Sequence, residues 1–268
     1  MKYVFISIAA LAACIAAGFL LTKLIWRKGK QSGKKMMLRS ILLGMAAAAV
    51  TAGVYLSVYY HADPECETCL ISSDSVNVEE IRSGYFFDGK GTEQALIFYP
   101  GAKVDTKAYA PLMYEIAENG TDCFLIKMPV HMAVLGINKA EAVMNEYSYD
   151  SWYLSGHSLG GTAASLFAVN HPEKVDGLIL LASYPTKEIS DSIGLLSVYG
   201  ENDGCLEKEV YEENKKFWPS DSAEFVIEGG NHADFGLYGE QRGDGQAEIT
   251  PEEQIRETAD QILTFTGN

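Results

Sequence analysis

A serine between two glycines is the first feature of the sequence that could perform covalent chemistry. Residues 156–161 read Gly-His-Ser-Leu-Gly-Gly, after the apolar run WYLS at 152–155 and before the small-residue stretch TAASLFAV. A strand, a sharp turn and a helix in this order are typical of a nucleophile elbow. Side chains at Gly156 or Gly160 would collide with the neighbouring backbone in such a strained turn. The pattern therefore predicts Ser158 as a nucleophile.

A serine hydroxyl needs a general base, and His232 is the histidine whose position in the chain suits that role. It follows a late apolar run, in the segment GGNHADF at 229–235. His157 is expected to point away from the nucleophile in such a turn, and His171 lies in a helix-ending Asn-His-Pro. The two remaining histidines, His61 and His131, come before the elbow. The order of the chain therefore favours His232.

The acid that orients this base is expected after the strand that precedes the histidine loop. The apolar run IGLLSVY at 193–199 leads into the polar turn GENDG at 200–204, which offers two carboxylates. We expect Asp203 to accept the Nδ1 proton of His232 and to stabilise the imidazolium. Glu201 is the alternative, because the end of a predicted strand is uncertain by several residues. The resulting order is serine, acid, histidine.

An oxyanion that develops during attack needs backbone N–H donors. One is expected from Leu159, the residue after the nucleophile. The second is expected from the loop YPGAKVD at 99–105, where Gly101 permits close approach of the backbone. Ala102 is the predicted donor, and Lys103 is the alternative. No residue pattern indicates a cofactor or a metal site.

These residues are positioned by a regular alternation of apolar runs and helical stretches. Short apolar runs, which predict buried strands, occupy residues 95–99, 123–127, 152–155, 175–182, 193–199 and 223–228. Helical patterns lie between and after them, at about 105–118, 138–147, 159–170, 206–218 and 251–265. This alternation predicts an α/β fold with a mostly parallel sheet and helices on both faces. The predicted catalytic residues all follow the carboxyl ends of strands, where such sheets form their sites.

Two uncharged runs near the N-terminus predict a transmembrane helical hairpin over residues 1–60. They cover residues 3–22 and 40–60, each long enough to span the hydrocarbon core. Seven Lys and Arg residues and no acids lie between them, which predicts a cytoplasmic loop. Both termini would then face outward. The predicted localisation is a multi-pass membrane protein with an extracytoplasmic catalytic domain.

Charge and cysteines constrain the remainder of the chain. All 36 Asp and Glu residues lie beyond His61 together with 13 of the 21 Lys and Arg, a net charge of −23. A nucleic-acid partner is therefore not expected, and neutral substrates fit better. Residues 61–84 are polar and mixed, which indicates a linker at 61–82 with an entry strand before a domain at 83–268. Cys66 and Cys69 lack a second pair to complete a zinc site, so a small disulfide or two idle thiols is expected.

Several segments resemble the serine-dependent α/β-hydrolases related to dienelactone hydrolase, and in particular a bacterial membrane-anchored group. The resemblance covers about residues 83–268 and is carried by YPGAKVD, Tyr109-Ala110-Pro111-Leu112, Lys127-Met128-Pro129, GHSLGG and NHADFGLYGEQRGDG. It implies the α/β-hydrolase fold and cleavage of an ester-like bond without a cofactor. Dienelactone hydrolase itself uses a cysteine nucleophile, so its lactone specificity does not carry over.

The sequence thus predicts a membrane-anchored enzyme that cleaves an ester or thioester of a small neutral molecule through an acyl-enzyme. An acyltransferase would use the same three residues and differ only in the acceptor. A binding protein that keeps the fold without catalysis is the alternative from another class, and an activated serine would exclude it.

Overall fold

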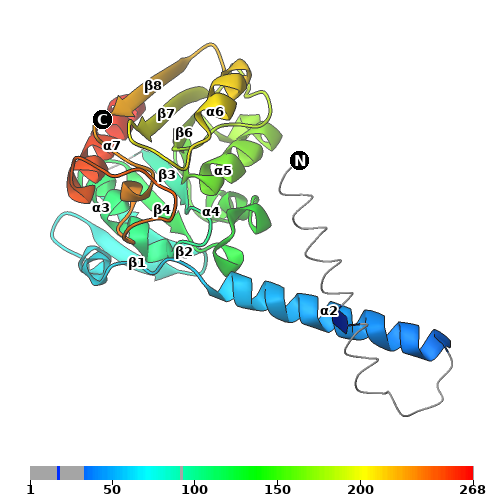
Figure 1. Ribbon diagram of the computed structural model, residues 1–268. Coiled ribbons are helices and arrows are strands. Elements are labelled where there is room, and N and C mark those ends of the chain that lie inside the picture. Colours follow the sequence, from blue (N-terminus) through cyan, green and yellow to red (C-terminus); the bar gives the residue numbers. More distant parts are fainter. Residues whose placement is uncertain (1–16, 19–32, 91–92, 268) are drawn as a thin grey trace. The chain divides into compact units, whose positions relative to one another are not determined.

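The computed structural model describes residues 17–18, 33–90 and 93–267, which fall into two compact units, Met1–Val58 and Tyr59–Asn268. The second unit is built on one eight-stranded sheet with the order β1-β2-β4-β3-β5-β6-β7-β8 (Figure 1). Its strands are β1 (Asn77–Ile81), β2 (Gly84–Asp88), β3 (Gln94–Tyr99), β4 (Asp122–Ile126), β5 (Ser151–His157), β6 (Gly177–Leu181), β7 (Gly194–Gly200) and β8 (Ser222–Ile227).

Strands β3 to β8 pair in parallel. Strands β1 and β2 form an antiparallel hairpin, and β2 also pairs with β4 in the antiparallel direction. The parallel register brings Tyr99 beside Gly156, and Gly156 beside Leu180. The ends of β3, β5 and β6 therefore lie at one edge of the sheet. This edge carries both the loop after Tyr99 and the turn that contains Ser158.

Helices cover both faces of the sheet (Figure 1). The α-helices of this unit are α3 (Ala110–Glu118), α4 (Lys139–Glu146), α5 (Leu159–Asn170), α6 (Lys208–Asn214) and α7 (Pro251–Thr266). Buried side chains of α3 and α7 share one apolar cluster, and those of α4 and α5 share another. Successive residues of β3 alternate between the clusters, because side chains of a strand point to opposite faces in turn.

Short 3-10 helices occupy several of the connections. They are η1 (Pro64–Leu70), η2 (Thr106–Tyr109), η3 (Pro129–His131), η4 (Ala133–Leu135), η5 (Pro172–Lys174), η6 (Lys215–Phe217) and η7 (Ala233–Phe235). The six parallel strands agree with the predicted apolar runs to within a few residues, so the prediction of a mostly parallel α/β sheet is confirmed.

The segment expected to hold a linker and an entry strand is part of the second compact unit. It contains η1 and β1, and the compact unit begins at Tyr59. The thiol of Cys66 is fully buried and donates to the Leu237 carbonyl at 3.5 Å. Burial raises the pKa of this thiol to about 12. Cys66 and Cys69 are both free thiols and not a disulfide, which agrees with the expectation of two idle thiols.

The first unit contains the helix α2 (Gly33–Ser57). Within the described residues, Lys34–Ser57 is the one helix long and apolar enough to cross a membrane. Signal sequences and buried core helices have the same length and composition, so this helix alone does not define a membrane protein. The expected span 3–22 lies outside the described residues apart from Ala17 and Gly18.

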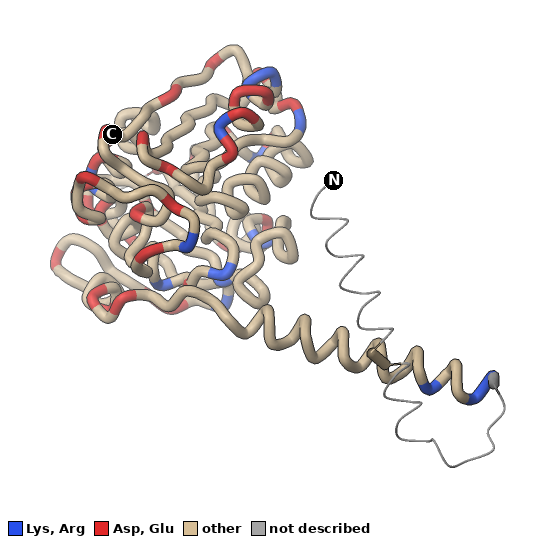
Figure 2. The backbone as a smooth tube through the Cα atoms, viewed as in Figure 1, with Lys and Arg blue, Asp and Glu red and all other residues tan. Residues whose placement is uncertain are grey.

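The bounds and charges of α2 differ in part from the predicted second span of 40–60. The helix starts earlier, so that Lys34, Lys35 and Arg39 lie in its first turns, and it ends at Ser57. It carries no acidic residue, whereas acidic residues are spread over the elements of the second unit (Figure 2). A Cβ atom built on Gly18 would lie only 2.6 Å from the Gly44 backbone nitrogen, so these two residues approach closely.

Candidate active site

The backbone at Ser158 has an unusual conformation, with φ 53° and ψ −125° between the end of β5 and the start of α5. A non-glycine residue with positive φ is strained, and such strain concentrates at functional sites. The Ser158 N–H donates to the Leu181 carbonyl at 2.8 Å, which fixes the turn to the end of β6. The serine is thus presented at the carboxyl edge of the sheet.

Gly160 allows α5 to begin directly against the end of β3. A Cβ atom at this position would lie 2.1 Å from the Tyr99 carbonyl oxygen and 2.4 Å from that of Pro100. No side chain fits at such a distance, so a residue other than glycine would push the helix away from the sheet. The structure thus agrees with the prediction that a side chain at Gly160 would collide with the neighbouring backbone.

His232 and Asp203 form a buried pair at the ends of β8 and β7. The His232 Nδ1 atom lies 2.8 Å from Asp203 Oδ2, and the two side chains are 4% and 0% exposed. A carboxylate only accepts hydrogen bonds, so this contact places the proton of a neutral imidazole on Nδ1 and leaves Nε2 as the acceptor. This tautomer is the one that a general base requires.

The other oxygen of Asp203 is held by the backbone. Oδ1 accepts from the Cys205 N–H at 2.8 Å and from the Leu206 N–H at 2.7 Å. These two bonds fix the direction in which Oδ2 points. Glu201, the alternative acid, is exposed and accepts from the Gly229 N–H at 3.2 Å. The structure therefore brings Asp203, and not Glu201, to His232.

Ser158 and His232 line the same cavity, which has a volume of about 200 Å³. The cavity is open to solvent, and it is bounded by the turn at Ser158, the start of α5 and the loops that follow β6, β7 and β8. The residues along its wall are Ser158, Leu159, Thr162, Ala182, Ser183, Tyr184, Cys205, Leu206, Glu207 and His232. Sequence reasoning did not identify Thr162, Ser183 and Tyr184, because nothing in their local patterns marks them as wall residues.

His157 points away from the cavity, as expected. Its Nδ1 atom pairs with the Tyr109 hydroxyl at 2.8 Å, and Tyr109 also accepts from the Gly101 N–H at 3.2 Å. Burial, and to a smaller extent nearby His232, holds the pKa of His157 well below its ordinary value. His157 is therefore neutral, and its contacts fix the backbone of the loop after β3.

The structure leaves Ala102 free to donate in this loop. Gly101 donates to Tyr109, and the Lys103 N–H donates to the His131 carbonyl at 2.7 Å. Among the described residues the Ala102 N–H has no acceptor. Leu159 is the first residue of α5, where the N–H has no acceptor within the helix. Leu159 lines the cavity and Ala102 does not.

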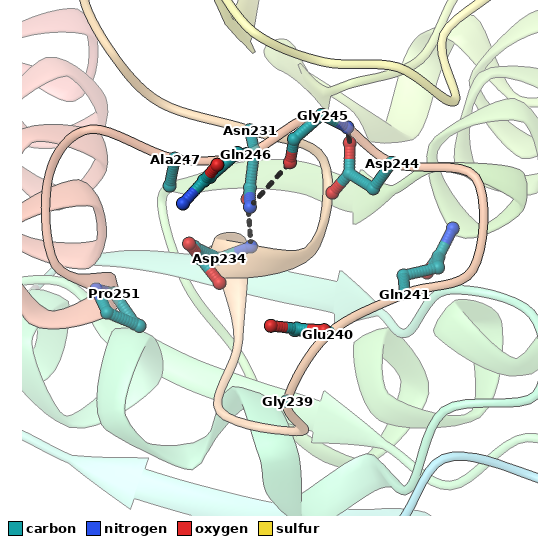
Figure 3. Close-up of a pocket in the computed structure, with 10 residues that line it drawn as sticks. All are labelled: Asn231, Asp234, Gly239, Glu240, Gln241, Asp244, Gly245, Gln246, Ala247 and Pro251. Carbon is teal, nitrogen blue, oxygen red and sulfur yellow. Dashed lines mark hydrogen bonds between the residues drawn. The ribbon is translucent and has the colours of Figure 1, made fainter.

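A larger cavity of about 610 Å³ lies beside the histidine loop (Figure 3). It is lined mainly by polar residues of 231–251, and it contains none of Ser158, Asp203 and His232. Burial, and then the charge of Asp244, raises the pKa of Asp234 on its wall to about 6. We assign the chemistry to the smaller cavity, because the candidate nucleophile and base are there.

The alpha/beta hydrolase family model matches residues 95–256. This strand order, with a strained serine between β5 and α5, defines the α/β-hydrolase fold, and the chain belongs to the alpha/beta hydrolase family. The enzyme is therefore a hydrolase of this family. No curated protein matches the chain.

Solved structures of hydrolases share this fold at low sequence identity. A predicted CIB-like hydrolase from Thermoplasma acidophilum is 16% identical with a TM-score of 0.53, over 71% of this chain and all of the other. An esterase from Mycobacterium tuberculosis is 12% identical with a TM-score of 0.53, over 76% and 95% of the two chains. Naproxen esterase from Bacillus subtilis is 12% identical with a TM-score of 0.51, over 75% and 94%.

Proposed function

We propose that the protein is a serine esterase that cleaves an ester or thioester of a small neutral molecule. The observation that carries this proposal is the buried Asp203–His232 pair, whose imidazole lines the same cavity as the strained Ser158. An acid, a base hydrogen-bonded to it and a nucleophile in the same cavity are the three groups that acyl transfer requires. Two of the similar solved structures are described as esterases, which supports the same reaction class.

In the proposed mechanism, His232 Nε2 removes the Ser158 proton as the hydroxyl oxygen attacks the carbonyl carbon of the substrate. The Leu159 and Ala102 N–H groups stabilise the negative charge on the carbonyl oxygen. The imidazolium then protonates the leaving alcohol or thiol as its bond to the carbonyl carbon breaks. His232 then takes a proton from water, which attacks the acyl carbon, and returns that proton to the Ser158 oxygen as its bond to the acyl carbon breaks and the acid leaves. Asp203 stays ionised and stabilises the imidazolium in both halves of the cycle.

The size and surroundings of the cavity support a small acyl group and a neutral substrate. A volume of about 200 Å³ is below the usual range for drug-sized ligands. The acidic domain repels anions. We therefore expect hydrolysis of p-nitrophenyl acetate and butyrate by the purified full-length protein, and much slower hydrolysis of long-chain esters. Ser158→Ala should abolish this activity without lowering Tm, and an unchanged rate in that variant would contradict the proposal.

The proposed domain organisation is a membrane hairpin at residues 1–60 followed by an extracytoplasmic hydrolase domain. The apolar helix α2 supports the second span. The close approach of Gly18 to Gly44 and Ser40 supports a hairpin, because small residues allow membrane helices to pack tightly. The basic residues between the runs support a cytoplasmic loop. Protease treatment of intact spheroplasts should digest the domain, whereas protection until lysis would contradict this orientation.

A further inference from the structure

One carboxylate, that of Asp244, accepts hydrogen bonds from both loops that carry the Asp203–His232 pair. Its Oδ1 atom accepts from the Gly204 N–H at 3.0 Å, directly after Asp203 in the chain. The same oxygen accepts from the His232 N–H at 3.2 Å. Its Oδ2 atom accepts from the Ala233 N–H at 2.8 Å. A single side chain thus joins the turn of the acid to the loop of the base.

The backbone around Asp244 is also fixed against the turn of the acid. A Cβ atom on Gly245 would lie 1.8 Å from the Asn202 carbonyl oxygen, so the two segments are in direct backbone contact. The Asn231 Oδ1 atom accepts from the Asp234 N–H at 2.9 Å, and Asn231 Nδ2 donates to the Gly245 carbonyl at 3.4 Å (Figure 3). The segment that carries Asp244 is therefore held from both sides, which determines where its carboxylate lies.

The charge of Asp244 suits this connection better than a neutral group would. Hydrogen bonds from backbone N–H groups to a carboxylate are shorter and stronger than those between neutral groups. Asp244 lines the larger cavity (Figure 3), and it is not among the residues that line the cavity containing Ser158. Its hydrogen bonds are to the backbone of the two loops, so we expect Asp244 to affect the reaction through the positions of these loops.

We propose that Asp244 is a positioning residue that sets the separation of Asp203 Oδ2 and His232 Nδ1. This inference rests on the proposed function, since it assigns a role within the same reaction. Catalytic groups are sensitive to placement, and a displacement of about 1 Å costs roughly 100-fold in rate. The expected result of weakening the connection is a loss of kcat, with little change in KM.

Asp244→Asn tests this role with a side chain of the same shape. An amide keeps one acceptor oxygen, but its NH₂ group would face a backbone N–H and cannot accept from it. We expect kcat to fall by roughly 10- to 100-fold with KM within about twofold of the wild-type value. Glu240→Gln is the matched control, because it removes the same charge from an exposed residue on the wall of the same cavity. That variant should keep the wild-type kcat.

The measurement uses the full chain and a p-nitrophenyl ester as substrate. The concentration of active sites is first determined by titrating the serine to completion with a fluorophosphonate. The maximal rate divided by this concentration gives kcat per titrated serine. Titration counts only folded enzyme with a reactive serine, so a loss of stability alone leaves this quantity unchanged. A lower kcat per titrated serine in Asp244→Asn, but not in Glu240→Gln, is the expected result. Equal values in all three proteins would overturn the role of Asp244. A wild-type enzyme that is not labelled would contradict the proposed function itself, and this role with it.

Discussion

The two halves of the candidate site are built in different ways. The nucleophile lies in a turn fixed by its immediate neighbours, where β5, Ser158 and α5 follow one another and Gly160 meets the end of β3. The acid and the base come from loops 29 residues apart in the chain, and side-chain carboxylates join those loops. Steric fit at Gly160 thus dominates in the first half, whereas in the second half hydrogen bonds to the carboxylates of Asp203 and Asp244 add to the backbone contact at Gly245. The two halves should therefore respond differently to substitution.

The largest effect is expected from a substitution at Gly160, in the turn that carries the nucleophile. Gly160→Ala would place a Cβ atom 2.1 Å from the Tyr99 carbonyl oxygen, so α5 must move or the domain cannot fold. We expect loss of esterase activity together with a fall in Tm of more than about 10 °C, well beyond that of a typical substitution. Gly53→Ala is the control, because nothing lies within 4 Å of its Cβ atom. Normal Tm and activity in Gly160→Ala would show that the turn is not sterically fixed.

A smaller effect, on kcat and not on stability, is expected from substitutions of the acid that pairs with His232. Asp203→Asn should reduce kcat by about 10³- to 10⁴-fold, because an amide favours the wrong tautomer of His232. Glu201→Gln should leave kcat within about twofold, since Glu201 bonds to Gly229 and not to the histidine. Steady-state kinetics on a short-chain ester compares the two variants. A larger loss in Glu201→Gln than in Asp203→Asn would move the acid to Glu201.

The smallest effect concerns stability and depends on pH. The folded protein favours the protonated form of Asp234, whose pKa is raised to about 6. Its stabilising contribution is fully present below the ordinary pKa of about 4 and is lost as pH rises through 6. Asp234→Asn stays neutral, so its Tm should exceed that of the wild type by a few degrees at pH 8. The Tm values of the two proteins should converge at pH 4. A constant difference in Tm from pH 4 to 8 would contradict the raised pKa of Asp234.

The same contrast explains how much the sequence could predict. The six parallel strands were predictable because buried strands are continuous apolar runs. The hairpin of β1 and β2 was not predicted beyond a single entry strand, because β1 reads Asn-Val-Glu-Glu-Ile and is mostly exposed. The end of β7 at Gly200 could not be located from sequence, which left Glu201 and Asp203 as alternatives. The catalytic roles of Ser158, Asp203 and His232 stay predictions.

Asp244 lies beyond the reach of a sequence pattern for a physical reason. Its partners are backbone N–H groups, which almost every residue has, so no residue type elsewhere in the chain signals the contacts. The wall residues Thr162 and Tyr184 present the same difficulty, since only the packing of α5 and the end of β6 brings them to the cavity. Local motifs predict the nucleophile well, and the surroundings of the acid and base require the three-dimensional structure.

The most direct test of the central claim is to label the full-length protein with a fluorophosphonate and to locate the adduct by mass spectrometry. An activated serine reacts with this reagent, and an ordinary hydroxyl does not. The account predicts a single adduct on Ser158, absent in Ser158→Ala and strongly reduced in His232→Ala. No adduct, an adduct on another residue, or equal labelling of His232→Ala would contradict the assignment of Ser158 as a nucleophile activated by His232.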